Sequence, residues 1–308
     1  MSLATEIQKH SQGATGTVGA RTETGPGANG DRVSGILRRL TSTASRLGPI
    51  GAVAVLALAA AAALWPGLLT GLDPLTGNPA ERLLPPSADH LFGTDQLGRD
   101  VFARTVHGSA QTLSASLIAV LIGVGAGVLI GLVSGFFTRA VDAIFMRTVD
   151  VLQAVPGLLL SMAVITALGF GTLNVALAVG VAAVPSFARL TRAEVSRWRT
   201  TEFVRAARAD GLSAAAVLAR HVLPQVRGPI LALVALEFGS AVLAVSALSF
   251  LGFGAPPPQP EWGLLVSEGR DFLAAAWWMT TLPGLVVAAV VLAANRVSHA
   301  VNSEREFR

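Results

Sequence analysis

The sequence predicts an all-α integral membrane protein with six transmembrane helices. Of its 308 residues, 52% are hydrophobic and 14% are charged, whereas soluble domains carry about a quarter charged residues. The apolar residues gather in six runs, each close to the ~20 residues that cross a bilayer. The runs cover roughly 48–69, 113–137, 149–169, 172–188, 229–252 and 280–298.

The first 47 residues precede the first run and are expected to be a largely disordered tail, because they are rich in Gly, Ser and Thr. Arginines just before residue 48 could be mistaken for the start of a signal peptide. The run 48–69 is long enough to cross a bilayer, and no small-residue cleavage site follows it, so we interpret it as a retained anchor. Residues 48–302 then form one transmembrane domain, and 303–308 form a short tail.

The distribution of basic residues predicts the orientation in the membrane. The two tails, the end of the last run with Arg296, and the connections 138–148 and 189–228 carry 19 Lys and Arg on one side of the membrane, whereas 70–112 and 253–279 carry four on the other. Because cytoplasmic loops carry the basic excess, both termini are predicted to be cytoplasmic. The formal charge of +4 then reflects topology and does not indicate a nucleic-acid partner.

The segment after the first run contains the sequence HLFGTDQLGRDVFART, residues 90–105. Thr94 can cap a short helix that has Asp95 in its first turn. Asp100 and Arg104 have the spacing of an i,i+4 ion pair on the exposed face of this helix. Its apolar side would let it lie along the membrane surface.

Polar residues also occur near the third run and inside the fifth. Arg147 and Asp150 are three residues apart and can pair along a helix, which favours a packing role at the cytoplasmic edge. Glu237 lies about two turns inside the fifth run, where an acid is costly. It could line a pathway or bind an internal partner, and both alternatives remain open. Ser246 and Ser249 are expected to pack and to bond their own backbone.

Residues 202–224 form the longest polar, basic interruption between the runs. The first eight residues, EFVRAARA, favour a helix. Gly211 can adopt the left-handed conformation that ends it. Ser213 can cap a second helix, and Pro224 is expected to close that helix. The segment therefore predicts a helix-turn-helix hairpin.

This hairpin resembles the cytoplasmic coupling segment of importer-type ABC-transporter permeases. The family pattern runs Glu-Ala-Ala, three residues, Gly, nine residues, then Ile-x-Leu-Pro. Arg205 stands where the family has Glu, and His221 stands where it has Ile. The residues that match the pattern are Ala206, Ala207, Gly211, Leu223 and Pro224.

Two further motifs resemble the C-type permease subunit of dipeptide and oligopeptide importers. One is HxFGTDxxGRDxxxR within residues 90–104, and the other is LSFLGFGAPPPQPEWG, residues 248–263. In the second motif, glycines break the fifth helix and prolines form a stiff connector. Trp262 is suited to the membrane–water boundary, and the segment would form an external scoop. Val245 stands where the family often carries an acid.

The resemblance implies a type I ABC importer permease fold in the bacterial plasma membrane. The implied partners are a homologous B-type permease, two cytoplasmic ABC ATPase subunits or one fused pair, and an external solute-binding protein. ATP and Mg would be bound by the ATPases, so no cofactor or metal is expected in this chain. Coupling would involve Glu202, Arg205, Ala206, Ala207, Arg208, Gly211, Leu223 and Pro224. The external scoop would involve Gly93, Thr94, Asp95, Gly98, Arg99, Asp100, Pro260, Glu261 and Trp262, and the pathway would involve Glu237.

Peptides are the expected cargo, with nickel, haem or another small solute as the alternative. A self-sufficient secondary transporter is disfavoured because it would be expected to show repeat symmetry and several intramembrane charges. A membrane scaffold would not need the broken fifth helix. The sequence contains no GxxxxGK[ST], HExxH or GxSxG motif, so an enzymatic role is not expected.

Overall fold

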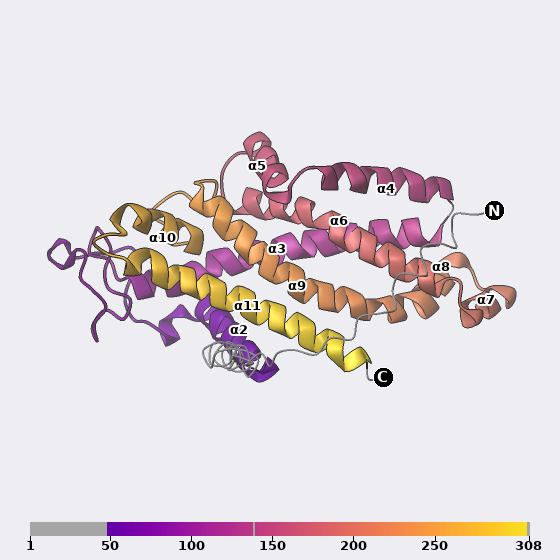
Figure 1. Ribbon diagram of the computed structural model, residues 1–308, viewed down its shortest axis with the longest axis horizontal. Helices are drawn as coiled ribbons and strands as arrows, with labels where there is room; N and C mark the ends of the chain where they lie inside the picture. Colours follow the sequence, from indigo (N-terminus) through magenta and orange to yellow (C-terminus); the bar gives the residue numbers. More distant parts are fainter. Residues whose placement is uncertain (1–47, 138, 307–308) are drawn as a thin grey trace, which may run out of the picture. The chain divides into compact units, whose positions relative to one another are not determined.

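The computed structural model describes residues 48–137 and 139–306, which are mainly helical (Figure 1). The tail 1–47, expected to be disordered, lies outside the described residues. The α-helices are α2 (Pro49–Leu64), α3 (Val101–Phe136), α4 (Arg139–Ala154), α5 (Gly157–Leu168), α6 (Thr172–Trp198), α7 (Glu202–Ala209), α8 (Ala214–Val217), α9 (Leu223–Phe250), α10 (Trp262–Gly269) and α11 (Trp278–Glu306).

All six predicted apolar runs fall on helices. By length and composition, the described residues contain four helices that could cross a membrane: α3, α6, the continuous stretch Ala214–Phe250, and Trp278–Ala300 of α11. Helices α4 and α5 pass the same test only as a pair, bent by 94°. With 16 residues, α2 is shorter than the ~20 that span a bilayer. The count of spans is therefore four or five.

The bend between α4 and α5 follows from the local sequence. Pro156 stands between the two helices, and its ring cannot continue the hydrogen-bond ladder of α4. Proline also disfavours a helical conformation in the residue before it, Val155. The third apolar run is thus a broken helix, not the single helix predicted from its length.

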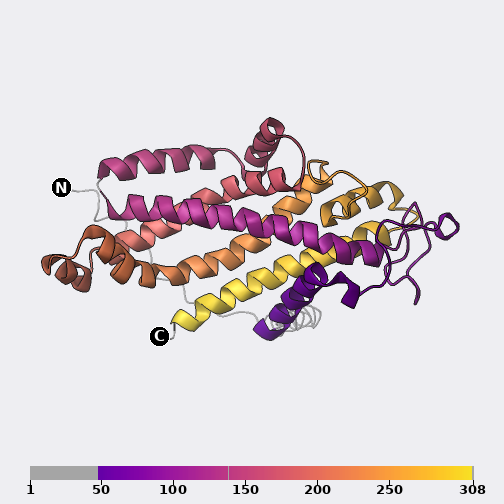
Figure 2. The same cartoon turned by 180° about the vertical axis from the view of Figure 1, so that it is seen from behind.

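Small residues let α3 and α6 pack closely along each other (Figure 2). Four glycines recur at every fourth position on α3, which places them on one face. A Cβ at Gly127 would lie 2.5 Å from the Cβ of Phe187 and 2.7 Å from the carbonyl oxygen of Val184. The two backbones are therefore in direct contact. The glycines are Gly123, Gly127, Gly131 and Gly135.

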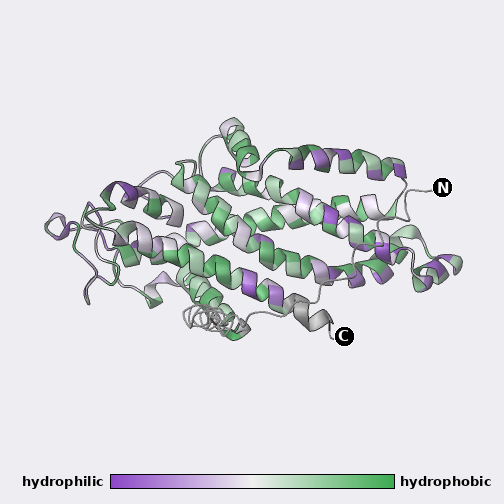
Figure 3. Ribbon diagram, in the orientation of Figure 1, coloured by the Kyte–Doolittle hydropathy of each residue, from purple (hydrophilic) through white to green (hydrophobic). Residues whose placement is uncertain are grey.

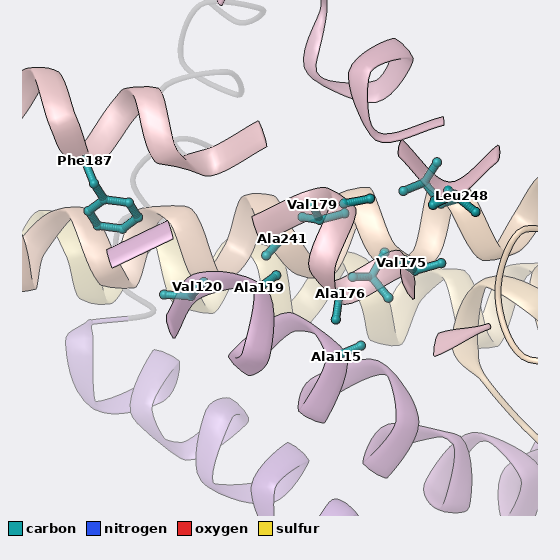
Figure 4. Packing of buried hydrophobic residues seen from close by; sticks show 12 residues of the cluster. Ala115, Ala119, Val120, Val175, Ala176, Val179, Phe187, Ala241 and Leu248 are labelled. Carbon is teal, nitrogen blue, oxygen red and sulfur yellow. The ribbon is translucent and has the colours of Figure 1, made fainter. Parts of the chain in front are cut away.

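The largest part of the core lies where α3, α6 and α9 meet (Figure 4). Small residues of α3, such as Ala115 and Ala119, pack with valines of α6 in this cluster, and Leu248 of α9 belongs to it as well. Hydrophobic residues predominate on these central helices, whereas α7 is mostly hydrophilic (Figure 3). The core therefore joins three of the four long helices and leaves α7 at its margin.

Candidate functional site

The predicted hairpin is present at residues 202–224. Helix α7 ends at Ala209, and Gly211 has a φ of +84°, a conformation that residues with a Cβ rarely adopt. The Ser213 side chain caps α8 by accepting a hydrogen bond of 3.3 Å from the backbone N–H of Ala216. The sequence thus predicted both the turn and the start of the second helix.

Pro224 does not close the second helix, contrary to the sequence expectation. From α8 the chain passes through one π turn, Leu218–Val222, directly into α9. In this wide turn, the N–H of Leu223 donates to the carbonyl of Leu218, five residues back. Pro224 follows this turn at the start of α9, so its missing N–H falls where the π turn already interrupts the regular hydrogen-bond ladder. The hairpin's second arm and a spanning helix therefore form one stretch, Ala214–Phe250.

An apolar cluster anchors the hairpin to the ends of α3 and α6. Val204 and Val217, from the two arms, are fully buried against Phe136 of α3 and Val195 of α6. Ala207 belongs to the same buried cluster, so it cannot give another protein's backbone close access. Of the predicted alanine pair, only Ala206 is exposed.

The charged residues of the hairpin lie on its exposed side. Glu202, Arg205 and Arg208 are exposed, as are Leu223 and Pro224. The guanidinium carbon of Arg208 lies 4.7 Å from the centre of the Phe136 ring, within range of a cation–π contact. Every predicted coupling residue except Ala207 is therefore accessible to a partner.

At the other end of α3, the polar motif of residues 90–105 does not form the predicted surface helix. Thr94 caps no helix; its hydroxyl accepts from the N–H of Leu84 and donates to the carbonyl of Glu81. The helix begins only at Val101, because the Asp100 carboxylate accepts from the N–H of Ala103 at 2.6 Å. The segment before it is an irregular loop closed by one bridge between Thr94 and Asp100.

The predicted exposed pair of Asp100 and Arg104 is also wrong. The other carboxylate oxygen of Asp100 lies 2.8 Å from Nδ1 of His90. Arg104 is only 1% exposed, and its Nη1 donates to Asp95 at 2.9 Å and to Glu268 of α10 at 2.6 Å. Asp95 also accepts from Nε of Arg99 at 2.6 Å. The motif therefore builds a buried charge network.

The sequence analysis missed Glu268, which is 164 residues from Arg104 and belongs to no motif. At two predicted glycines of the same loop, other parts of the chain come too close for a residue with a side chain. The Cβ that a larger residue would add at Gly98 falls 1.9 Å from the carbonyl oxygen of Asn78, and at Gly93 it falls 2.7 Å from Nε1 of Trp278. These motif residues therefore hold the loop together.

The connector after α9 inserts a further buried acid into this region. Glu261 is fully buried and caps α10, accepting from the N–H of Leu264 at 3.1 Å and from Oγ1 of Thr112 at 2.7 Å. Burial raises the pKa of the Glu261 carboxyl, and these hydrogen bonds, with others from Ser249 and Gly263, oppose that rise. The predicted back-bonding role of Ser249 thus gives way to a contact with this carboxylate.

The Trp262 side chain is buried within the protein and does not present its ring to a membrane surface. It is 1% exposed, and its Nε1 donates to the carbonyl of Thr105 at 2.9 Å. Pro260, also predicted for the scoop, is buried. A Cβ at Gly108 of α3 would lie 3.2 Å from the backbone nitrogen of Glu261. The connector therefore packs directly against α3, and the Trp262 side chain lies buried between them.

The remaining polar residues pair between helices. Asp150 bonds to Arg189 at 2.7 Å and Asp142 bonds to Arg192, so the expected Arg147–Asp150 pair is replaced by bridges from α4 to α6. Glu237 is half-buried on α9, with Ser186 of α6 within hydrogen-bonding reach. Ser186 is thus a candidate for its internal partner.

Comparison with known proteins adds independent evidence. Residues 127–304 match the family model described as "Binding-protein-dependent transport system inner membrane component". The chain is 37% identical over 235 residues, 76% of its length and 77% of the relative's, to the dipeptide transport system permease protein DppC of Alkalihalophilus pseudofirmus. It is 40% identical over 210 residues to the glutathione transport system permease protein GsiD of Escherichia coli, covering 68% of this chain and 69% of that protein.

A solved structure supports the fold. An amino acid ABC transporter crystallised with histidines superposes with a TM-score of 0.52 at 17% identity, covering 67% of this chain and 94% of the other. At that identity the likeness concerns the fold alone.

Proposed function

Because the chain belongs to the family of binding-protein-dependent transport system inner membrane components, we propose that it is the permease subunit of an ATP-driven importer of di- and oligopeptides. It would form half of the translocation path and couple to a separate ATPase. The names of its relatives, dipeptide and glutathione transport permeases, favour peptide cargo. Nickel, haem or another small solute is the alternative cargo.

The observation that carries this proposal is the continuity of the hairpin with a spanning helix. The hairpin is anchored by buried valines, while Glu202, Arg205 and Ala206 remain exposed. Its second arm runs without interruption to Phe250. A partner that moved the exposed side would therefore move α9 as well, which suits a rigid-body change between two states of a path.

The proposed assembly follows from this arrangement. The hairpin would dock on one of two cytoplasmic ATPases, and a homologous permease would supply the second half of the path. Both termini would be cytoplasmic, in agreement with the basic residues of the sequence. The loops around Arg104 and Glu261 would then face an external solute-binding protein. Glu237 is proposed to line the path or to brace α9 through Ser186.

The turn residue Gly211 provides the central test. Replacing Gly211 by Val should abolish ATP-driven peptide uptake, because a β-branched residue at a φ of +84° is strained. An added Cβ would meet no atom within 4 Å, so the effect would come from the backbone and not from a clash. Uptake is measured with labelled dipeptide in vesicles that contain the complete transporter.

Asn at position 211 is the matched control, because Asn tolerates the left-handed conformation better than Val does. We expect Gly211→Asn to retain most uptake, and both variants to insert into the membrane. Wild-type uptake by Gly211→Val would refute the coupling role of the hairpin. Uptake that continues with no ATPase in the purified complex would favour a self-sufficient transporter.

Ala206 tests the docking surface without disturbing the fold. Its side chain is exposed, so Ala206→Trp should leave the chain folded but block close approach of an ATPase. We expect at least a tenfold loss of ATPase recovered in pull-downs from detergent-solubilised membranes, on the order of 1.4 kcal/mol. Ala206→Ser is the control and should recover wild-type amounts. Equal recovery with Trp would exclude Ala206 from the contact.

A further inference from the structure

Beside the hairpin lies a groove of about 800 Å³ whose lining combines arginines with aromatic rings. Arg199, Arg205 and Arg208 supply its basic side, and Phe136, Phe137 and Leu212 supply most of its apolar side. Among the residues that the structure describes, no Asp or Glu lines it. We propose that this groove binds the headgroup of an anionic phospholipid. The inference needs only the placement of the helices in a membrane and does not depend on the cargo.

Two of the three groove arginines, Arg205 and Arg208, have no acidic partner within the described part of the chain. Arg205 forms no ion pair there, and Arg208 has an aromatic ring, not an acid, as its neighbour. The nearby carboxylate of Asp142 is occupied by two hydrogen bonds from Arg192. The groove thus presents excess positive charge, and an anion would complete it.

Arg199 is held in place by the end of α3. Its Nη1 donates to the carbonyl of Gly135 at 2.9 Å, and the negative end of the helix dipole favours a cation there. The position of this arginine is therefore fixed before any ligand arrives. Preorganised charge is a feature of a binding site, because it reduces the entropy lost on binding.

The apolar lining of the groove and its position at the end of α3 favour a lipid over a soluble anion as the ligand. The groove lies where α3, a helix long and apolar enough to span a membrane, comes to its end at Phe136. Lipid phosphates lie just outside the hydrocarbon core that such a helix crosses. The ring of Phe137 is half-exposed and could contact the glycerol and upper acyl region. Basic pockets at helix ends bind anionic headgroups in the same way.

The test uses the delipidated full-length chain in detergent, with phosphatidylglycerol or phosphatidylcholine added in mixed micelles. Bound lipid is measured by native mass spectrometry. We expect the wild type to retain phosphatidylglycerol in preference to phosphatidylcholine. Arg205→Gln should bind it roughly fivefold more weakly, and Arg205→Gln with Arg208→Gln roughly 25-fold more weakly, since each arginine near a membrane surface contributes a factor of about five.

The control variant combines Arg197→Gln with Arg227→Gln, which removes the same charge from exposed positions outside the groove. It should retain phosphatidylglycerol like the wild type. Equal retention by the groove and control variants would overturn the proposal. Displacement of the bound lipid by millimolar inorganic phosphate alone would instead make this a site for soluble anions. Unchanged lipid retention with loss of the ATPase from pull-downs would assign the arginines to the protein partner only.

Discussion

A Gly127→Leu variant is expected to fail to accumulate as a folded protein in the membrane. An added Cβ at Gly127 would lie 2.5 Å from the Cβ of Phe187, 2.7 Å from the Val184 carbonyl oxygen and 3.1 Å from the Ala188 nitrogen. Two of these atoms belong to the backbone of α6 and cannot move without displacing the helix. Ordinary overpacking costs about 1–3 kcal/mol, and a clash between backbones should exceed that. The measurement is the yield of monodisperse protein after detergent extraction.

Gly125 gives a matched control on the same helix. An added Cβ there meets no atom within 4 Å, so Gly125→Leu should be extracted in wild-type amounts. Leu is also compatible with a lipid-facing position. If Gly127→Leu were as well folded as Gly125→Leu, the close packing of α3 against α6 would be wrong.

The second large effect is expected from Arg104→Gln. Removing this guanidinium leaves the carboxylates of Asp95 and Glu268 in a buried site with one cation fewer. Breaking a buried ion pair in this way costs about 3–5 kcal/mol. The thermal unfolding midpoint of the purified chain should therefore fall by roughly 10 °C. It can be followed by the change in intrinsic tryptophan fluorescence on heating.

Arg270 is the control for Arg104, because it also pairs with an acid near α10 but in solvent. The side chains of Arg270 and Asp271 are 60% and 75% exposed, and such surface pairs contribute about 0–1 kcal/mol. Arg270→Gln should leave the midpoint nearly unchanged. A midpoint for Arg104→Gln within 2 °C, roughly the error of such a melt, would show that the network does not hold the loop to α10.

The parts of the fold that the sequence predicted depend on local rules. The apolar runs are helical, although the third is divided between α4 and α5, because length and hydrophobicity act within the run itself. The hairpin was predicted from Gly211 and Ser213, whose turn and cap involve neighbours only a few residues away. Pro156 indicates the bend at the same local level, whereas the length of the run alone predicts a single helix.

The errors concern residues whose partners are distant in the chain. Arg104 has a nearby acid at the right helical spacing, but it bonds Glu268, and Trp262 bonds the carbonyl of Thr105, 157 residues away. Spacing within one motif cannot show which other segment covers it. The motifs at residues 90–105 and 248–263 were identified separately, although Trp262 of the second forms a buried contact with Thr105 of the first. The expectation that Pro224 ends a helix fails for a different reason. The π turn before it has no sequence signature.

The length of α3 has a consequence for its position in the bilayer. Its 36 residues extend about 54 Å at ~1.5 Å per residue, whereas the hydrocarbon layer is only ~30 Å thick. Nearly half of the helix must therefore stand clear of the lipid tails. The segment 101–112 carries Arg104, Thr105 and Thr112, so we infer that this end supplies most of the length outside the lipid tails. The charge network around Arg104 would accordingly belong to a small headpiece outside the lipid tails, supported by a helix that continues unbroken into the membrane.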